Sequence, residues 1–116
     1  MLLLYLKAIM IKSFFNDEGF FMTKEYILDF LRQNKTLLEE KYHVTKIGLF
    51  GSYAKDLATD TSDIDIAIVS NKKDFFLREE LREFLEEHFK LKVDLGYFDS
   101  IREFYKKRIQ SEIIYA

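Results

Sequence analysis

The sequence predicts one α+β domain, built from a small mixed β-sheet with helices packed on it. Three observations predict this fold class. Short β-branched runs alternate along the chain with longer segments of helical apolar periodicity. The 116 residues are enough for one compact core and too few for two domains. Hydrophobic residues make up 48% of the chain, including twelve Phe and seven Tyr, so a packed interior is expected.

The composition also limits the function classes. The formal net charge is −2, whereas nucleic-acid binding through phosphates needs a concentrated excess of Lys and Arg. We therefore expect no direct nucleic-acid binding, and the basic runs at residues 72–73 and 106–108 are expected to be solvated faces. The alternative is that either run contacts RNA or an acidic partner. The chain has no Cys, which excludes disulfides and thiolate chemistry and fits a cytoplasmic protein.

Residues 1–21 precede the segment that has the pattern of a working domain. Their apolar run is interrupted by Lys7 and Lys12 and has neither a basic front nor a small-residue cleavage site, so it predicts no signal peptide and no membrane span. Met22 then opens MTKEYILDFL, which is typical of a first helix. We expect residues 1–21 to be an N-terminal extension or a misplaced start, or else an added element that packs on a partner, and residues 22–116 to be the domain.

The first half of the domain is predicted as helix, strand, short loop or helix, and strand. The first helix runs from Thr23 to about Lys41, because its apolar residues recur at helical spacing. VTKIGLF is short, β-rich and ended by Gly51, which indicates a strand. IDIAIVS indicates the second strand, after a connection over residues 51–62 that is long enough to carry function. The apolar positions of the helix are Ile27, Phe30, Leu31, Leu37 and Leu38.

The second half is predicted as helix, strand and helix, with the helices over one face of the sheet. A polar turn at residues 71–73 leads into the strongest helical pattern in the chain. LKVDLGYF indicates a third strand. Ser100 and Glu103 have the spacing of a capping box at the start of the last helix. The apolar faces are Leu77, Leu81, Phe84, Leu85 and Phe89 in the first of these helices, and Ile101, Phe104, Tyr105, Ile109 and Ile113 in the second.

Two acids lie in a strand that could have carried more core residues. Side chains at i and i+2 of a strand point to the same face, so Asp63 and Asp65 share one face. The residues between and after them, Ile64, Ile66 and Ile68, point to the other face, which is the core. The acid backbones lie roughly 6–7 Å apart, and two such charges repel unless a cation neutralises them. Magnesium fits, because it takes oxygen ligands and usually keeps one or two protein carboxylates.

A third acid and a glycine turn extend this candidate site. Asp94 alternates with apolar residues in the third strand. If that strand lies beside the second, about 4.8 Å away, Asp94 reaches the same patch as Asp63 and Asp65. Three carboxylates could then hold two metal ions roughly 3.5–4 Å apart, the arrangement that enzymes use for in-line displacement at phosphorus. Gly51 and Ser52 follow the first strand, where backbone N–H groups and a hydroxyl can contact phosphate, and Lys55 could add a charge. A Gly-Ser pair after a strand is usually only a turn, so the combination carries the prediction.

The combination resembles the nucleotidyltransferase fold of the DNA polymerase β superfamily. More narrowly, the region from Met22 to the C-terminus is similar to the minimal nucleotidyltransferase (MNT) proteins. The motif that carries the resemblance is Gly51-Ser52-x-Ala54, followed by Asp63-x-Asp65 and later by Asp94. The resemblance implies magnesium as cofactor, ATP as substrate, and transfer of AMP to a hydroxyl.

The resemblance also implies a role for each site residue. Asp63 and Asp65 would be metal ligands, and Asp94 would be the third ligand or the base that helps to deprotonate the hydroxyl. Gly51, Ser52 and Lys55 would bind the triphosphate. The family commonly has Arg-Gly where this chain has Lys55 and Asp56, so a negative charge is expected near the triphosphate.

Members of this size are often encoded beside a HEPN-domain ribonuclease and act as its antitoxin, some by adding AMP to a tyrosine. The resemblance therefore implies a HEPN toxin as substrate and as partner in a hetero-oligomer, with no membrane involvement. Two alternatives remain. The protein could be a binding antitoxin that neutralises its partner by contact alone, or a small-molecule adenylyltransferase, which a chain without a substrate domain makes the less favoured alternative.

Overall fold

The computed structural model describes residues 22–116, and the expected extension at residues 1–21 lies outside them. No helix within 22–116 is both long and apolar enough to span a bilayer. Helices and strands follow the predicted order, with a 3₁₀ turn and a short last strand that were not predicted. The elements are α2 (Lys24–Gln33), α3 (Lys35–Tyr42), β1 (Val44–Phe50), α4 (Gly51–Ala54), β2 (Ile64–Ser70), α5 (Phe75–Phe89), β3 (Val93–Tyr97), η1 (Phe98–Ser100), α6 (Glu103–Glu112) and β4 (Ile114–Tyr115).

Four strands form one mixed sheet in the order β3-β2-β1-β4. β1 is antiparallel to both β2 and β4, whereas β2 is parallel to β3. Parallel neighbours need a crossover connection, which α5 supplies. The predicted mixed sheet is confirmed, and β2 lies in its interior between β1 and β3.

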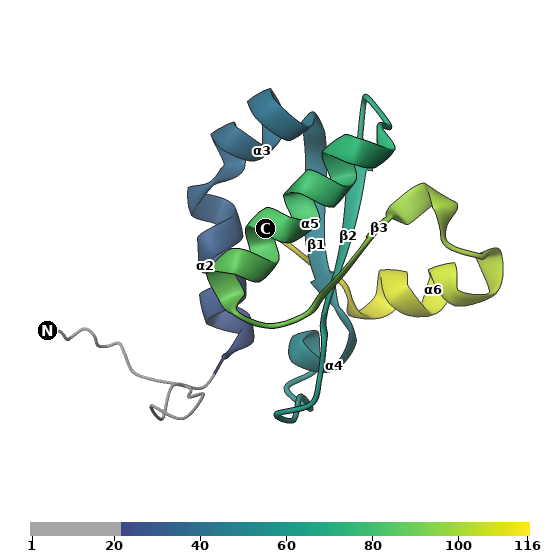
Figure 1. Ribbon diagram of the computed structural model, residues 1–116. Helices are drawn as coiled ribbons and strands as arrows, with labels where there is room; N and C mark the ends of the chain where they lie inside the picture. Colours follow the sequence, from purple (N-terminus) through teal and green to yellow (C-terminus); the bar gives the residue numbers. More distant parts are fainter. Residues whose placement is uncertain (1–21) are drawn as a thin grey trace, which may run out of the picture.

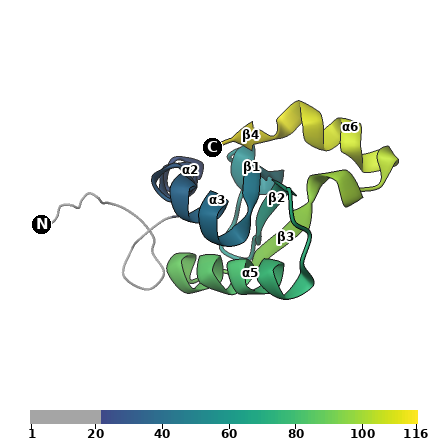
Figure 2. The same cartoon turned by 90° about the horizontal axis from the view of Figure 1, so that it is seen from above.

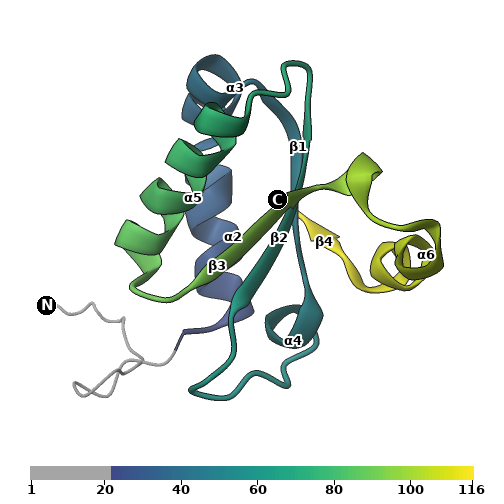
Figure 3. The ribbon, with the colours of Figure 1, turned by 45° about the vertical axis from the view of Figure 1, so that its right-hand side comes forward.

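Three helices, α2, α3 and α5, cover one face of the sheet (Figure 1, Figure 3). The isoleucine face of β2 points into the core beneath them: Ile64 and Ile66 are fully buried, and Ile68 is 2% exposed. Leu31 of α2 and Leu85 of α5 are also fully buried. The alternation in IDIAIVS therefore predicted the core face of this strand correctly.

The predicted first helix is divided into α2 and α3 at Asn34. The Asn34 side-chain amide donates a hydrogen bond to the Phe30 carbonyl oxygen at 2.8 Å, so it caps the end of α2 instead of continuing the helix. Asn competes with the backbone for hydrogen bonds in this way and favours helix ends. The apolar spacing continues past Asn34, so it did not indicate that the helix ends there.

The last helix was predicted incorrectly in two respects. It begins at Glu103 after Arg102, with no side-chain cap, and Ser100 ends the 3₁₀ turn, so the capping box is absent. No residue of α6 is buried, and Phe104 is 83% exposed. Seen from above, α6 lies on the side of the sheet away from α5 (Figure 2). Its apolar spacing had the pattern of a core-facing helix, but the core was already covered by α2, α3 and α5.

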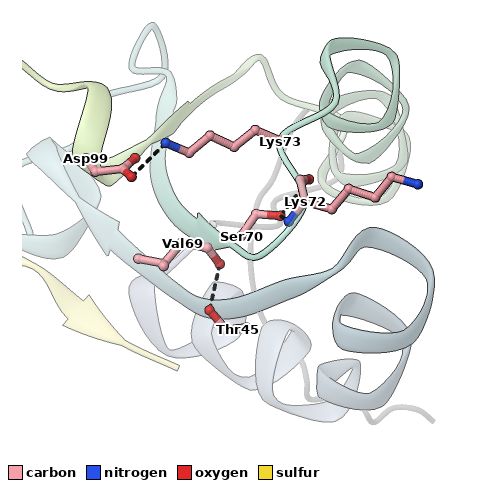
Figure 4. Close-up of polar contacts among 6 residues, drawn as sticks. All are labelled: Thr45, Val69, Ser70, Lys72, Lys73 and Asp99. Atoms are coloured by element: carbon pink, nitrogen blue, oxygen red, sulfur yellow. Dashed lines mark hydrogen bonds and ion pairs between the residues drawn. The ribbon is translucent and has the colours of Figure 1, made fainter.

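An ion pair links the turn after β2 to η1. Figure 4 shows the Lys73 ammonium group directed at the Asp99 carboxylate, with 2.7 Å between Nζ and Oδ2. The Lys72 backbone N–H donates to Ser70 Oγ at 3.1 Å, while the Lys72 side chain extends away from this contact (Figure 4). Both lysines of this run are exposed, and Lys73 is engaged in an ion pair.

Gly48 of β1 sets how closely the C-terminus packs on the sheet. A Cβ at this position would lie 2.7 Å from both Cδ1 and Cγ1 of Ile113. We expect Gly48→Ala to lower the free energy of unfolding by about 1–3 kcal/mol, as overpacking does. Thermal denaturation measures this effect. The double variant with Ile113→Ala should lose less than the sum of the two single variants, because the clash is then removed; strict additivity would contradict this packing.

Candidate functional site

The candidate site lies where β1 ends and where β2 and β3 begin. In the antiparallel pairing Phe50, the last residue of β1, is opposite Asp65. In the parallel pairing Asp65 is opposite Asp94. The strand register therefore brings the Gly51 turn, Asp65 and Asp94 together, although Asp94 comes 43 positions after Gly51 in the sequence (94 − 51). The second and third strands are adjacent, which is the condition on which Asp94 was expected to join the site.

The three acids differ in exposure. Asp65 is half-buried within β2, whereas Asp94 is exposed on the neighbouring strand. Asp63 is also exposed and lies one residue before β2 begins, not within the strand as predicted. Asp65 is thus the least exposed of the three acids, and it lies between the other two along the chain.

The electrostatic field at Asp65 disfavours its charged form. Burial is the main cause of a raised pKa, which moves from the ordinary value of 3.8 to about 6. The negative charges of Asp94, Asp63 and Glu112 add to this effect, in that order. Such a concentration of negative charge is costly for the folded protein and favourable for a bound cation.

The donor set of this site fits a hard divalent cation. Within residues 22–116 the structure shows no group of three or more His, Cys, Asp or Glu side chains placed so that they could hold a metal ion together. Asp65 and Asp94 are nevertheless direct cross-strand neighbours, and Mg²⁺ commonly takes one or two carboxylates while phosphates and water complete its shell. A cation between them would relieve the repulsion that raises the pKa of Asp65.

Gly51 makes the close approach of the turn to Asp65 possible. Its φ of +76° is in the left-handed region, which residues with a Cβ rarely adopt. A Cβ built at this position would overlap Oδ2 of Asp65. Ser52 follows in the short helix α4 and is half-buried. The turn thus places Gly51 directly beside the Asp65 carboxylate.

Glu112 is a site residue that the sequence did not indicate. The Gly51 N–H donates a hydrogen bond of 2.8 Å to Glu112 Oε2, and Lys55 Nζ lies 3.6 Å from Oε1 of the same carboxylate. The Glu112 side chain is only 13% exposed. It lies 61 residues after Gly51 at the end of a helix rich in charge, where one more acid carries no distinguishing pattern.

Asp56 does not leave an uncompensated charge near the turn. Its φ is 59°, so it adopts the left-handed conformation that glycine would adopt at this place. The Lys24 ammonium group lies 2.8 Å from Asp56 Oδ2, which neutralises the carboxylate. Asp56 also raises the pKa of Lys24, first through this hydrogen bond and then through its charge. The charge expected near a triphosphate is thus already paired.

The family to which this arrangement of strands and acids belongs is identified by sequence similarity. The sequence profile of the nucleotidyltransferase domain matches residues 31–116. The chain belongs to the nucleotidyltransferase domain family. The match includes the Gly51 turn and all three acids, and its mixed sheet with packed helices is the nucleotidyltransferase fold that was expected.

Curated relatives of this nucleotidyltransferase domain are protein adenylyltransferases by name. A Methanocaldococcus jannaschii protein named "Putative protein adenylyltransferase" is 43% identical over 98 residues, which cover 81% of this chain and 98% of the relative. "Protein adenylyltransferase MntA" of Thermococcus cleftensis is 35% identical over 96 residues, which cover 82% of this chain and 97% of the relative.

Solved structures share the fold of this nucleotidyltransferase domain. One described as "putative minimal nucleotidyltransferase" has a TM-score of 0.69 at 19% identity and covers 80% of this chain and 95% of its own. A toxin–antitoxin structure with AMP-PNP has a TM-score of 0.61 at 27% identity, with coverages of 81% and 72%. A complex of tri-AMPylated Shewanella oneidensis HEPN toxin with MNT antitoxin has a TM-score of 0.52 at 27% identity, with coverages of 78% and 66%.

Proposed function

We propose that this nucleotidyltransferase is an antitoxin that transfers AMP from ATP to a tyrosine hydroxyl of a HEPN-type ribonuclease toxin and so neutralises it. One observation carries the proposal: the register that places Asp65 opposite Asp94 and beside the Gly51 turn, in a chain similar to proteins named protein adenylyltransferases. The solved complex of an AMPylated HEPN toxin with an MNT antitoxin supports a HEPN toxin as the protein that accepts AMP.

The reaction exchanges the phosphoanhydride bond between the α- and β-phosphates of ATP for a phosphodiester bond to the tyrosine oxygen. The tyrosine oxygen forms a bond to the α-phosphorus of ATP, the bond from that phosphorus to the bridging oxygen breaks, and pyrophosphate leaves with the electron pair. The hydroxyl proton passes to a base, for which exposed Asp94 is the candidate. Asp63, Asp65 and Asp94 would hold one or two Mg²⁺ ions, which when bound neutralise developing charge on the phosphate oxygens.

The Gly51 turn would bind the triphosphate. The first-turn amides of a helix have no intrahelical acceptor, and the Ser52 hydroxyl adds a donor beside them. Lys55, whose side chain is 39% exposed, supplies a positive charge at the edge of the turn. The chain's own residues therefore act mainly by positioning the phosphates against the carboxylates.

Intact-mass measurement on the partner toxin tests the proposal. The full chain, incubated with purified HEPN toxin, ATP and Mg²⁺, is expected to increase the toxin mass by one or more AMP groups and to abolish its ribonuclease activity. Chelation of Mg²⁺ by EDTA should prevent both changes. A toxin silenced with no gain in mass would identify a binding antitoxin instead, and AMP found only on a small molecule would identify a small-molecule adenylyltransferase.

A further inference from the structure

Two of the residues assigned to the triphosphate, Gly51 and Lys55, contact one carboxylate of the protein itself. Glu112 accepts the Gly51 N–H at 2.8 Å through Oε2 and pairs with Lys55 through Oε1 at 3.6 Å. A hydrogen bond to a charged acceptor, in a side chain that is 13% exposed, is stronger than one in open solvent. Glu112 therefore bridges the backbone of the turn to its lysine.

The backbone that follows Glu112 is fixed to β1. Two residues later Ile114 pairs with Leu49 and Tyr115 pairs with Gly48 in the antiparallel register of β4. The Ala116 N–H donates to the Ile47 carbonyl oxygen at 3.0 Å.

The intervening Ile113 is equally constrained, because it packs so closely on Gly48 that a Cβ there would lie 2.7 Å from its side chain. Glu112 is thus presented to Gly51 by the same strand, β1, whose end carries the turn. A carboxylate anchored in this way is suited to hold the turn and poorly suited to swing out.

We propose that Glu112 is a positioning residue for nucleotide binding: it fixes the Gly51 turn and orients Lys55, while touching no phosphate itself. This inference rests on the proposed function, because it assigns the turn to the triphosphate. It also changes one assignment within that function. Since the Gly51 N–H is already engaged, the phosphate contacts fall to Ser52 and the oriented Lys55, and Gly51 serves to let the turn approach Asp65.

Two substitutions of Glu112 separate its hydrogen bond from its charge. Glu112→Ala removes both contacts and leaves the Gly51 N–H without its acceptor. Glu112→Gln keeps a carbonyl oxygen that can accept from Gly51 but loses the ion pair with Lys55. Glu103→Ala is the matched control, because it removes an exposed acid from the first turn of the same helix.

Calorimetric titration of the full chain with AMP-PNP and Mg²⁺ measures the affinity, and toxin modification at varied ATP gives kcat and KM. We expect Glu112→Ala to raise the Kd for AMP-PNP and the KM for ATP about 10-fold or more, which corresponds to loss of one charge-assisted hydrogen bond. Glu112→Gln should recover most of the affinity, and Glu103→Ala should match the unsubstituted chain.

The possible outcomes distinguish this role from the proposed function. If the unsubstituted chain binds AMP-PNP and modifies the toxin while Glu112→Ala binds it as tightly, the positioning role is overturned and the function stands. If Glu112→Ala binds more tightly, Glu112 is a competitor for the phosphate site, which also overturns the role. An unsubstituted chain that neither binds AMP-PNP nor modifies the toxin overturns both.

Discussion

Asp65→Asn is expected to abolish AMP transfer and, at the same time, to stabilise the metal-free protein at pH 8. Transfer should fall by about 1,000-fold or more, because the central carboxylate of the site is lost and preorganised charge supplies much of such a rate. The stabilisation has a separate cause. The folded protein holds the pKa of Asp65 at about 6, mainly through burial and then through Asp94, Asp63 and Glu112, so the ionised form is unfavourable.

The sign of the stability effect follows from the direction of that shift. A folded-state pKa above the unfolded value of 3.8 means that the contribution of Asp65 to stability is present below pH 3.8 and lost as the pH rises through about 6. The full shift corresponds to about 3 kcal/mol, which screening of this half-exposed side chain reduces to about 1 kcal/mol. Asn carries no charge, so it should raise the Tm by about 5 °C at pH 8 and by less at pH 5.

Calorimetric scans in EDTA at the two pH values, together with toxin mass measurements in Mg²⁺, test both parts of this result. Asp60→Asn is the matched control, since Asp60 is an exposed loop acid outside β2. It should leave the Tm and the transfer rate unchanged. Retention of AMP transfer by Asp65→Asn would contradict the assigned role, and a Tm gain equal at pH 5 and pH 8 would contradict the electrostatic cause.

Gly51→Ala is expected to cost both stability and activity. The backbone at +76° is unfavourable for alanine, and the new Cβ would overlap Oδ2 of Asp65. Either the turn shifts or the carboxylate moves away from Asp94. We expect a loss of about 1–3 kcal/mol in the free energy of unfolding and a large fall in AMP transfer. Denaturant unfolding and toxin mass measurements give the two quantities.

Gly96→Ala provides the matched control for this substitution, because a Cβ at Gly96 of β3 would meet nothing within 4 Å. It should change stability little or increase it slightly, since alanine reduces the freedom of the unfolded chain. If Gly51→Ala kept the stability and the AMP transfer of the unsubstituted chain, the close approach between the turn and Asp65 would not matter for function.

Local sequence was sufficient for the features that depend on one strand or helix. The alternation of Ile64 and Ile66 with Asp65 identified the core face of β2, and the Gly-Ser pair identified the turn. The neighbouring position of Asp94 followed once two adjacent strands were assumed, and the register confirms it. The roles of Asp63, Asp65 and Asp94 as metal ligands remain predictions for the experiments above.

The features that the sequence did not indicate depend on contacts between distant segments. Glu112 becomes part of the site only because β4, a two-residue strand, pairs with β1. The apolar spacing of α6 would be the same whether the helix packed on the core or faced solvent, so it did not indicate that Phe104 is exposed. Asn34 could have indicated the end of α2 from its residue type, but the apolar pattern continued past it.

The ion pair between Lys24 and Asp56 has a consequence for how this family varies. Asp56 stands where the family resemblance leads us to expect glycine; its backbone is left-handed, with φ of 59°, and its carboxylate is neutralised by Lys24, the first residue of α2. An acid at this place is acceptable beside a triphosphate only when a cation lies within reach. The two positions are therefore expected to covary: chains with Asp at position 56 should carry Lys or Arg at position 24, and chains with Gly there should be free to carry any residue.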